Sequence, residues 1–482
     1  MQLEQVFKQF PPHSICFISF TRKAAYEAMD RVMEKFHYTE EELPLFRTMH
    51  SLAFEFLHLR RNNIMSPKDY YNLASITGTS ICFDAFDPFG HPEGMHIGNR
   101  MLRIISDSKN RRQSIRESWQ KLGESVDWND LLTFEEKLHE YKFDNNKMDF
   151  DDVIVNFVEF GTVPSVQVLF IDEAQDLSIV QWDMATKLSN KALFTYVAGD
   201  DDQSIYQWAG ADVQKFINLQ GKVETLGTSW RVPSSVKSLS NRVVSRINNR
   251  RDKQWESLPD RIGDVQYLHD PWAISDYLGE GTWLLLARTN GLLRIYEEIC
   301  HEVGYFYQYA NKNKDFKDII TAVRTWNVLR NEGIATGSRV KILYSLMRPN
   351  ERVKHGFKSK VASLDNKAIL DMQKLKDSYG LLCSDKEWYE ALDRINPDDI
   401  DYITNALEQD DIDTPRITIS TIHGVKGGEA ENVVLITDMG SITYDAMHDD
   451  PDQEHRVWYV ALTRTKNRLF IIEPETQYAY EI

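Results

Sequence analysis

The stretch "VLFIDEAQDLS" (residues 168–178) joins an apolar run to four acidic or amide side chains. An apolar run without alternation is typical of a strand in a parallel sheet that is buried on both faces. Ligands of such sheets bind beyond the carboxyl ends of the strands, where Asp172 and Glu173 stand. Mg²⁺ in phosphate-transfer sites takes one or two carboxylates together with phosphate oxygens. We therefore expect Asp172 to hold Mg²⁺ and Glu173 to polarise a water that attacks a γ-phosphate; a solvated strand end without function is the alternative.

Apolar runs of the same kind recur in two regions of the chain and alternate with helical patterns. The first region holds residues 14–20, 166–172 and 192–200, and the second holds residues 282–289, 416–424, 432–438 and 468–474. This alternation predicts two α/β domains with parallel sheets. The stretches between the runs show helical spacing and no strand pattern. We expect a first domain of residues 1–74 and 148–240 around a helical insertion at 75–147, and a second of residues 241–314 and 412–482 around a short helical insertion at 315–411.

Composition limits the classes of function. The net charge of −17 over 482 residues disfavours nucleic-acid binding by the whole surface, but a local basic groove is compatible with it because charges act over a Debye length of about 10 Å. The four cysteines show no CxxC spacing, which argues against a disulfide framework or a zinc site and fits a reducing, cytoplasmic location. Every apolar run is shorter than the roughly 18 residues that span a bilayer, so no membrane partner is expected.

The next strand pattern also ends in polar groups. In "VAGDDDQSIYQWAGA" (residues 197–211), Gln203 is placed to sense a phosphate at the neighbouring strand end. Tyr206 and Trp208 follow in a turn that we expect to be exposed. Aromatic rings in such a turn stack on nucleic-acid bases, at about 1–3 kcal/mol per base. The alternative is that both rings belong to the core.

Two strand-to-helix junctions offer places for a DNA phosphate. In "FISFTRKAAYEAM" (residues 17–29), Thr21 is the expected N-cap, and the helix N-terminus with Lys23 suits an anion. "RTMHSLAFEFL" (residues 47–57) repeats this arrangement with Thr48 and His50. His50 is either a DNA contact or a packed core residue, and Phe20 either stacks on a base or is buried under the sheet.

These motifs, taken in order, resemble those of the UvrD/Rep/PcrA-like superfamily 1 DNA helicases. The resemblance covers nearly all of both α/β regions and includes counterparts of motifs Ia, Ib, II, III, IV, V and VI. Beyond the four stretches above, it rests on "LGTSWRVPSSV" (226–236), "LLLARTNGLLR" (284–294), "ITISTIHGVKGGEAENVVLI" (417–436) and "VWYVALTRTKNRLFII" (457–472).

The resemblance implies two RecA-like domains of the P-loop NTPase fold and ATP hydrolysis between them. It also implies 3′ to 5′ translocation on single-stranded DNA and unwinding of duplex DNA. Arg231 and Arg464 are the candidate arginine fingers, because a guanidinium stabilises charge that develops on the transferring phosphoryl oxygens. The remaining contacts that the resemblance implies are nucleotide contacts from Arg288, Gly427 and Glu429 and DNA contacts from Asn290, Thr421 and His423.

The phosphate-binding loop of this class is missing from the sequence. No GxxxxGK[ST] pattern occurs, and the two nearest candidates, Gly221-Lys222 and "GVKGGE" (424–429), lack both the spacing and the Ser or Thr. Gly221-Lys222 is followed by Val223, which cannot ligate Mg²⁺. The resemblance places the loop just before the helix predicted at residues 1–12, so we expect a helicase without its first strand and loop. An internal methionine taken as the start, a split gene and a degenerate gene remain open as explanations. The alternative function is an ATPase-deficient DNA-binding fragment, or a split-helicase subunit that obtains the loop from a separate polypeptide.

Overall fold

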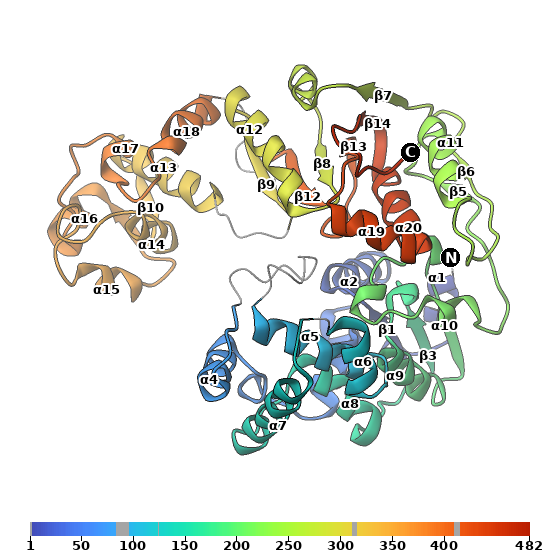
Figure 1. The fold of residues 1–482 in the computed structure, drawn as a ribbon. Helices are drawn as coiled ribbons and strands as arrows, with labels where there is room; N and C mark the ends of the chain where they lie inside the picture. The colour runs from blue at the N-terminus through green and yellow to red at the C-terminus, as the bar shows by residue number, and fades with distance from the viewer. Residues whose placement is uncertain (1, 83–95, 124, 311–315, 409–414) are drawn as a thin grey trace. The chain divides into compact units, whose positions relative to one another are not determined.

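A computed structural model describes residues 2–82, 96–123, 125–310, 316–408 and 415–482 (Figure 1). The chain forms two compact units. Unit 1 comprises Met1–Ser229, Ser240–Glu256 and Ser441–Val460, and unit 2 comprises Trp230–Leu239, Ser257–Gly440 and Ala461–Ile482. This two-part division does not test the four segments expected from the sequence, which stay a prediction.

Unit 1 is built on a parallel sheet with the strand order β2-β1-β3-β4. Its strands are β1 (Ile15–Ser19), β2 (Phe46–Thr48), β3 (Val168–Ile171) and β4 (Phe194–Val197). Both β1 and β3 are buried along their whole length, as the unbroken apolar runs predict. β4 is more exposed.

Helices cover both faces of this sheet because alternate side chains of β1 and β3 point to opposite sides. Cys16, Ile18 and Leu169 pack with one set of helices, and Ile15 and Phe17 pack with the other. The first set is α3 (Met49–Phe56), α8 (Phe150–Phe160) and α9 (Ile179–Ser189), and the second is α1 (Gln2–Phe7) and α2 (Arg22–Phe36). Thr21 and Thr48 cap α2 and α3, each accepting a backbone N–H at 3.2 Å. The capping prediction for Thr21 is confirmed.

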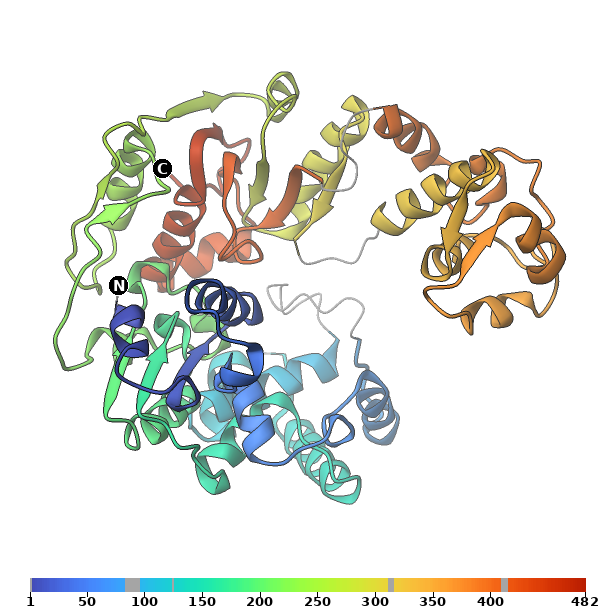
Figure 2. The same cartoon turned by 180° about the vertical axis from the view of Figure 1, so that it is seen from behind.

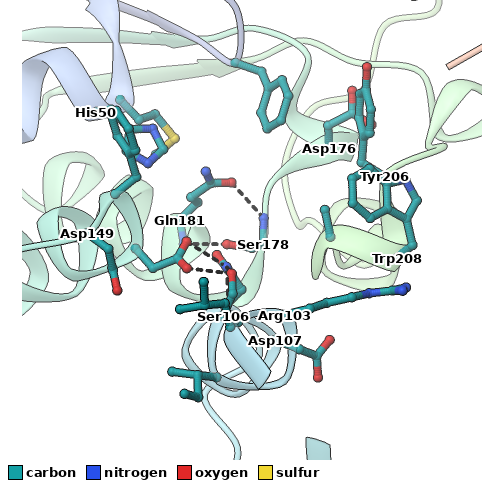
Figure 3. A pocket seen from close by; sticks show the side chains of 18 of the residues that line it. His50, Arg103, Ser106, Asp107, Asp149, Asp176, Ser178, Gln181, Tyr206 and Trp208 are labelled. Atoms are coloured by element: carbon teal, nitrogen blue, oxygen red, sulfur yellow. Dashed lines mark hydrogen bonds between the residues drawn. The ribbon is translucent and has the colours of Figure 1, made fainter. Parts of the chain in front are cut away.

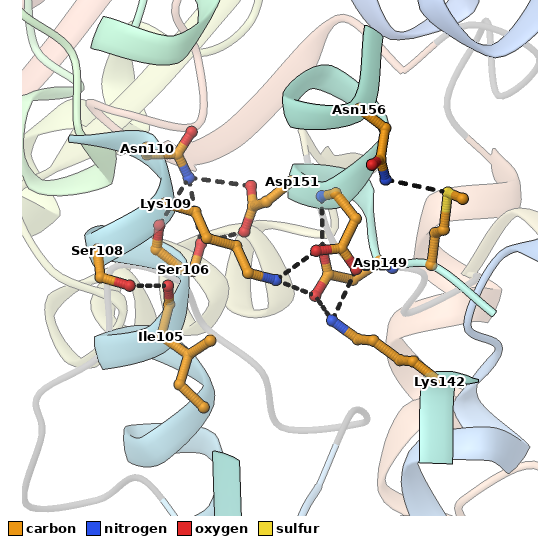
Figure 4. Close-up of polar contacts among 11 residues, drawn as sticks. Ile105, Ser106, Ser108, Lys109, Asn110, Lys142, Asp149, Asp151 and Asn156 are labelled. Atoms are coloured by element: carbon orange, nitrogen blue, oxygen red, sulfur yellow. Dashed lines mark hydrogen bonds and ion pairs between the residues drawn. The ribbon is translucent and has the colours of Figure 1, made fainter. Parts of the chain in front are cut away.

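The described part of residues 75–147 contains the helices α5 (Ile97–Asn110), α6 (Ile115–Leu122) and α7 (Trp128–Asp144). These helices share a separate apolar core with α4 (Pro67–Thr77), which begins before residue 75. Four buried or half-buried charges join α5 and α7 to the start of α8 (Figure 4). Lys109 and Lys142 each bind both Asp149 and Asp152, with Lys109 at 2.9 and 2.6 Å. Since every charge in the group has two partners, the insertion is held firmly on α8.

Unit 2 contains a six-stranded parallel sheet with the order β7-β14-β13-β8-β12-β9. The strands are β7 (Asp264–Leu268), β8 (Trp283–Ala287), β9 (Tyr307–Tyr309), β12 (Ile417–Thr421), β13 (Ala430–Ile436) and β14 (Thr465–Ile472). Together with the sheet of unit 1, this confirms the α/β class with two parallel sheets.

The second insertion is mainly helical and also contains two strands that the sequence did not predict. β10 (Ile334–Thr336) and β11 (Ile369–Asp371) form an antiparallel pair. The helices of this insertion are coloured from yellow to orange-red in Figure 2. They are α13 (Phe316–Arg330), α14 (Gly337–Ser345), α15 (Phe357–Ala362), α16 (Met372–Tyr379), α17 (Trp388–Ala391) and α18 (Asp398–Glu408).

Further α-helices lie in the described ranges of the two units. They are α10 (Val213–Ile217), α11 (Ser234–Val244), α12 (Arg294–Val303), α19 (Ser441–Asp449) and α20 (Pro451–Leu462). All four cysteines are free thiols, as the spacing predicts. Across the described ranges, the helices are too short or too polar to cross a membrane.

Candidate functional site

The carboxylates of Asp172 and Glu173 follow β3 at the edge of the unit 1 sheet that is formed by the carboxyl ends of its strands. Asp172 extends the pairing of β3 with β1 by donating its backbone N–H to Ile18 O at 2.9 Å. Glu173 then adopts a left-handed conformation with φ of 53°, which costs a non-glycine residue about 1–3 kcal/mol and is most frequent at functional sites. The turn redirects the chain immediately after the strand and separates the two carboxylates.

Asp172 and Glu173 form no ion pair with any residue in the described ranges. Burial, and then the charge of Glu173, raises the pKa of the Asp172 carboxyl to about 6. Two uncompensated carboxylates fit a divalent cation that completes its shell with phosphate oxygens. Among the described residues, no cluster of three or more His, Cys, Asp or Glu side chains forms a metal cage.

Gln175, which the sequence analysis did not single out, ties the two strand ends together. Its fully buried amide donates to Glu173 Oε2 at 2.6 Å and accepts from the backbone N–H of Asp200 at 3.0 Å. A Cβ at Gly199 would lie 2.4 Å from Gln175 Oε1, so a glycine is needed for this close approach. The signal in the sequence was an amide, which both donates and accepts, inside a run of carboxylates after a buried strand.

Gln203 lies in a loop that a network of charges holds in place. Its amide donates to Asp200 Oδ2 at 2.7 Å. Lys253 lies 2.5 Å from both Asp200 and Asp201, and Arg250 donates two bonds to Asp202 at 2.8 and 2.7 Å. The loop is therefore fixed by the segment Ser240–Glu256, a long-range pairing that spacing alone does not reveal.

Four of the predicted DNA-binding residues line one cavity of unit 1 with a volume of about 400 Å³ (Figure 3). Phe20 stacks on Tyr206 at 5.4 Å, and Tyr206 meets Trp208 edge to face at 6.3 Å. His50 packs against Phe150 at 5.9 Å, and burial lowers the pKa of its ring. The rings are half-buried, so they lie neither in the core nor in the exposed turn that we expected.

The other predicted residues of the first domain lie outside this cavity lining. Thr21 and Thr48 are used as helix caps, and Lys23 is exposed on the first turn of α2. The helical insertion, from which no site residue was predicted, contributes Asn99, Arg103 and several neighbours on α5 to the lining.

In unit 2, four predicted residues follow the carboxyl ends of two adjacent strands. Arg288 and Asn290 come directly after β8, and Thr421 and His423 lie at the end of β12, which pairs with β8. Thr421 and His423 are 7% and 2% exposed. The Thr421 hydroxyl accepts the N–H of Gly424 at 3.2 Å, which shapes the loop that follows.

The other predicted residues of unit 2 gather at the opposite edge of its sheet, where β13 and β14 begin. Glu429 binds Lys466 at 2.5 Å and Arg231 at 3.4 Å. Although burial opposes it, bonding to Lys466 and the charge of Arg231 hold the pKa of Glu429 below its usual value. Arg464, 2% exposed, donates to Gly428 O at 3.3 Å. Gly427 has φ of 79°, which favours glycine.

The structure therefore separates Arg288 from Glu429, although both were predicted to contact the nucleotide. The position of Arg288 favours the group of Asn290, Thr421 and His423, and its nucleotide contact stays a prediction. Lys466 was missed because a lysine within a strand pattern reads as a solvated side chain.

Family models match both units. The model for the UvrD/REP helicase N-terminal domain matches residues 5–224, and that for the UvrD-like helicase C-terminal domain matches residues 416–472. The chain belongs to the UvrD/Rep helicase family. Within this UvrD/Rep chain, the first match contains Asp172, Glu173, Gln203 and the aromatic cavity, and the second contains Glu429 and Arg464.

Curated relatives are similar over different lengths. The chain is 24% identical over 359 residues to the ATP-dependent DNA helicase PcrA of Bacillus subtilis (strain 168), a match that covers 66% of this chain and 47% of that protein. It is 23% identical to PcrA of Staphylococcus epidermidis (strain ATCC 12228), over 98% of this chain and 78% of that protein. A third match, 27% identical to PcrA of Staphylococcus aureus (strain NCTC 8325), covers 51% of this chain and 35% of that protein. The chain thus spans less than two thirds of the B. subtilis and S. aureus relatives.

Proposed function

We propose that this protein is an ATP-dependent DNA helicase that moves 3′ to 5′ along single-stranded DNA and unwinds duplex DNA. One observation carries the proposal. The Asp172–Glu173 pair is joined through Gln175 to the loop of Gln203, which leads within three residues into the aromatic cavity. A nucleotide-binding edge and a base-binding cavity in one unit are what a DNA-dependent ATPase needs. The similarity to PcrA proteins, which are ATP-dependent DNA helicases, supports it.

Each residue of the nucleotide edge has a separate task in this proposal. Asp172 would hold Mg²⁺, which neutralises charge on the β- and γ-phosphate oxygens when bound with ATP. Glu173 orients the attacking water and takes its proton. Gln175 fixes the Glu173 carboxylate, because its amide donates to Glu173 Oε2 at 2.6 Å. Gln203 donates to the γ-phosphate in place of its present bond to Asp200.

Arg231 and Arg464 are the proposed arginine fingers of unit 2. Each would donate to the developing charge of the phosphoryl group during transfer. Glu429 orients Arg231 through their ion pair. The structure supports these roles by placing both arginines beside Glu429 at one edge of the sheet.

Nucleotide state and DNA contact are connected along the chain. A shift of Gln203 toward a bound phosphate moves the turn that carries Tyr206 and Trp208, since only two residues separate Gln203 from Tyr206. The stacking contact between these rings and the DNA base would then change. We propose this as the link between hydrolysis and movement.

A second function has one observation in its favour. The sequence contains no GxxxxGK[ST] loop, and the backbone N–H groups and lysine of such a loop are hard to replace. A DNA-binding protein that does not hydrolyse ATP would retain the aromatic cavity without using Glu173. The comparisons give no support to a separate polypeptide that carries the loop, and the cytoplasmic location, supported by four free cysteines, stays a proposal.

Strand displacement tests direction and activity together. We expect ATP and Mg²⁺ to release the labelled strand from a duplex with a 3′ single-stranded tail, and to release much less from the same duplex with a 5′ tail. Equal release from both would refute the direction, and no release from either, with DNA still bound, would favour the second function.

We expect Tyr206→Ala and Trp208→Ala to weaken single-stranded DNA binding by about 10- to 100-fold each, because a stacked base is worth about 1–3 kcal/mol. Fluorescence anisotropy with a labelled oligonucleotide measures this without ATP. Tyr267→Ala is the control, since Tyr267 is an exposed ring on β7 that does not line the cavity. Unchanged binding in both cavity variants would contradict the assignment of the cavity to DNA.

Asp172→Asn is expected to raise the melting temperature of the metal-free protein near neutral pH. The folded-state pKa of Asp172, about 6, lies above the ordinary value of 3.8. The charged carboxylate therefore costs stability that appears as the pH rises from about 4 to 6 and is complete above that range. Thermal unfolding in a chelator at about pH 4 and pH 8 measures the change. A gain that is the same at both values would contradict this origin, and Mg²⁺-nucleotide should stabilise the wild type only.

A further inference from the structure

The helical insertion places a basic side chain in the aromatic cavity. Arg103, on α5, lines the cavity together with Tyr206 and Trp208, and Figure 3 shows it extending from α5 toward Trp208. Arg111, near the end of the same helix, donates to the backbone carbonyl of Gln207 between these rings. A Cβ at Gly210 would lie 2.8 Å from the Cβ of Asn110, so the helix and the turn are in close contact. Helix α5 is thus a fixed wall of the cavity.

Within the described ranges, Arg103 is in no hydrogen bond or ion pair, and only the charge of Asp107 acts on it from the same helix. The Nε atom of Arg103 is buried. The nearest carboxylate on the helix, Asp107, is already bound to Arg111 at 2.7 Å, Gln113 at 3.0 Å and Ser118 at 2.8 Å. A half-buried guanidinium without hydrogen bonds is costly, so this position fits an anion from outside the chain.

Two of the carboxylates that line the cavity, Asp149 and Asp151, do not oppose such an anion strongly, because each already has partners. Asp149 is bound by Lys109 and Lys142. Asp151 accepts from Ser106 at 2.5 Å and from Asn110 at 2.9 Å. Polar groups of the chain thus satisfy these carboxylates, whereas Arg103 is left unpaired.

We propose that Arg103 binds a backbone phosphate of single-stranded DNA whose base stacks in this cavity against Tyr206 and Trp208. A guanidinium beside aromatic rings matches the two chemical halves of a nucleotide, its anion and its planar base. The volume of about 400 Å³ is within the usual range for small-ligand sites, about 300–1,000 Å³. The proposal rests on the DNA binding proposed above and adds that the insertion contributes directly to it.

The test measures the affinity of the full chain for a fluorescent oligothymidine of about 16 nucleotides at several salt concentrations, without ATP. We expect Arg103→Met to raise the Kd about tenfold and to reduce the salt-dependence slope by about 0.7, the value for one phosphate contact on a single strand. Arg103→Lys retains the charge, so its slope stays near wild type while its affinity falls less. The melting temperature of Arg103→Met is not lowered, because the guanidinium forms no hydrogen bond or ion pair in the part of the chain that the structure describes.

Arg100→Met is the matched control. Arg100 lies one turn earlier on α5, donates to Ser125 at 2.5 Å and is outside the cavity lining. We therefore expect the Kd and the salt-dependence slope of Arg100→Met to stay near the wild-type values. Equal effects of Arg100→Met and Arg103→Met would overturn the proposal in favour of a general charge effect. If the wild type binds DNA and Arg103→Met has the same Kd and the same salt-dependence slope, this inference alone is overturned. No binding by the wild type would overturn the proposed DNA binding, and this inference with it.

Discussion

Glu173→Gln is expected to lower the kcat of DNA-stimulated ATP hydrolysis by about 10²- to 10⁴-fold, the usual contribution of a general base. The amide is nearly isosteric with the carboxylate and can still bond to Gln175, so the left-handed turn at Glu173 is retained. What is lost is the group that takes the proton of the attacking water. Single-stranded DNA affinity stays at the wild-type level because Glu173 does not line the aromatic cavity.

Glu27→Gln is the control for this experiment. Glu27 is a neighbouring carboxylate that acts on Asp172 through its charge and pairs with Arg31 on the surface of α2. Removing it changes the local charge by the same amount, and we expect hydrolysis within about twofold of wild type. Equal losses in both variants would show that charge near Asp172, and not proton transfer by Glu173, sets the rate.

Replacing Arg231 or Arg464 by lysine is expected to lower kcat by about 10³-fold or more, the range measured for arginine fingers. Lysine retains the charge but lacks the planar fork that donates to two phosphoryl oxygens. The KM for ATP changes less than kcat, because the developing charge exists only in the transition state. Steady-state kinetics with saturating single-stranded DNA separates the two parameters.

Arg468→Lys serves as the control for the arginine variants. Arg468 lies on β14, the strand that begins directly after Arg464. Its guanidinium donates to Asn432 at 2.8 Å and packs over Trp283. Its loss reduces stability and leaves kcat close to wild type. If Arg464→Lys lowers only the melting temperature, then Arg464 is a structural residue that supports the Gly428 carbonyl, and the assignment fails.

The main strands could be predicted because each is a continuous apolar run buried on both faces. β1, β3, β8 and β12 lie within expected segments, whereas β13 and β14 begin two and three residues before the segments expected at 432–438 and 468–474. The sequence patterns did not predict β2 and β9, because each has only three residues. They did not predict β7 either, because its sequence "DVQYL" has no apolar run and is only partly buried. Short or half-exposed strands form when a neighbouring strand offers its edge, which local pattern does not record.

The candidate site divides in the same way. Asp172, Glu173 and Gln203 follow buried strands, so their place at the sheet edge follows from the fold. Gln175 and Lys253 act through partners 25 or more residues away, and such pairing requires the folded chain. Arg103 lies in an insertion without motif, and only the cavity shows its relation to Tyr206 and Trp208. The opposite placement of Arg288 and Glu429 depends on which end of each strand a residue follows, which motif order does not give.

Whether this protein is a DNA-dependent ATPase is decided by the rate of ATP hydrolysis of the purified chain, measured with and without single-stranded DNA. We expect turnover that rises with single-stranded DNA and is lost in Glu173→Gln. An absence of turnover while single-stranded DNA still binds would contradict this expectation, and would identify the protein as a DNA-binding member of the family that does not hydrolyse ATP.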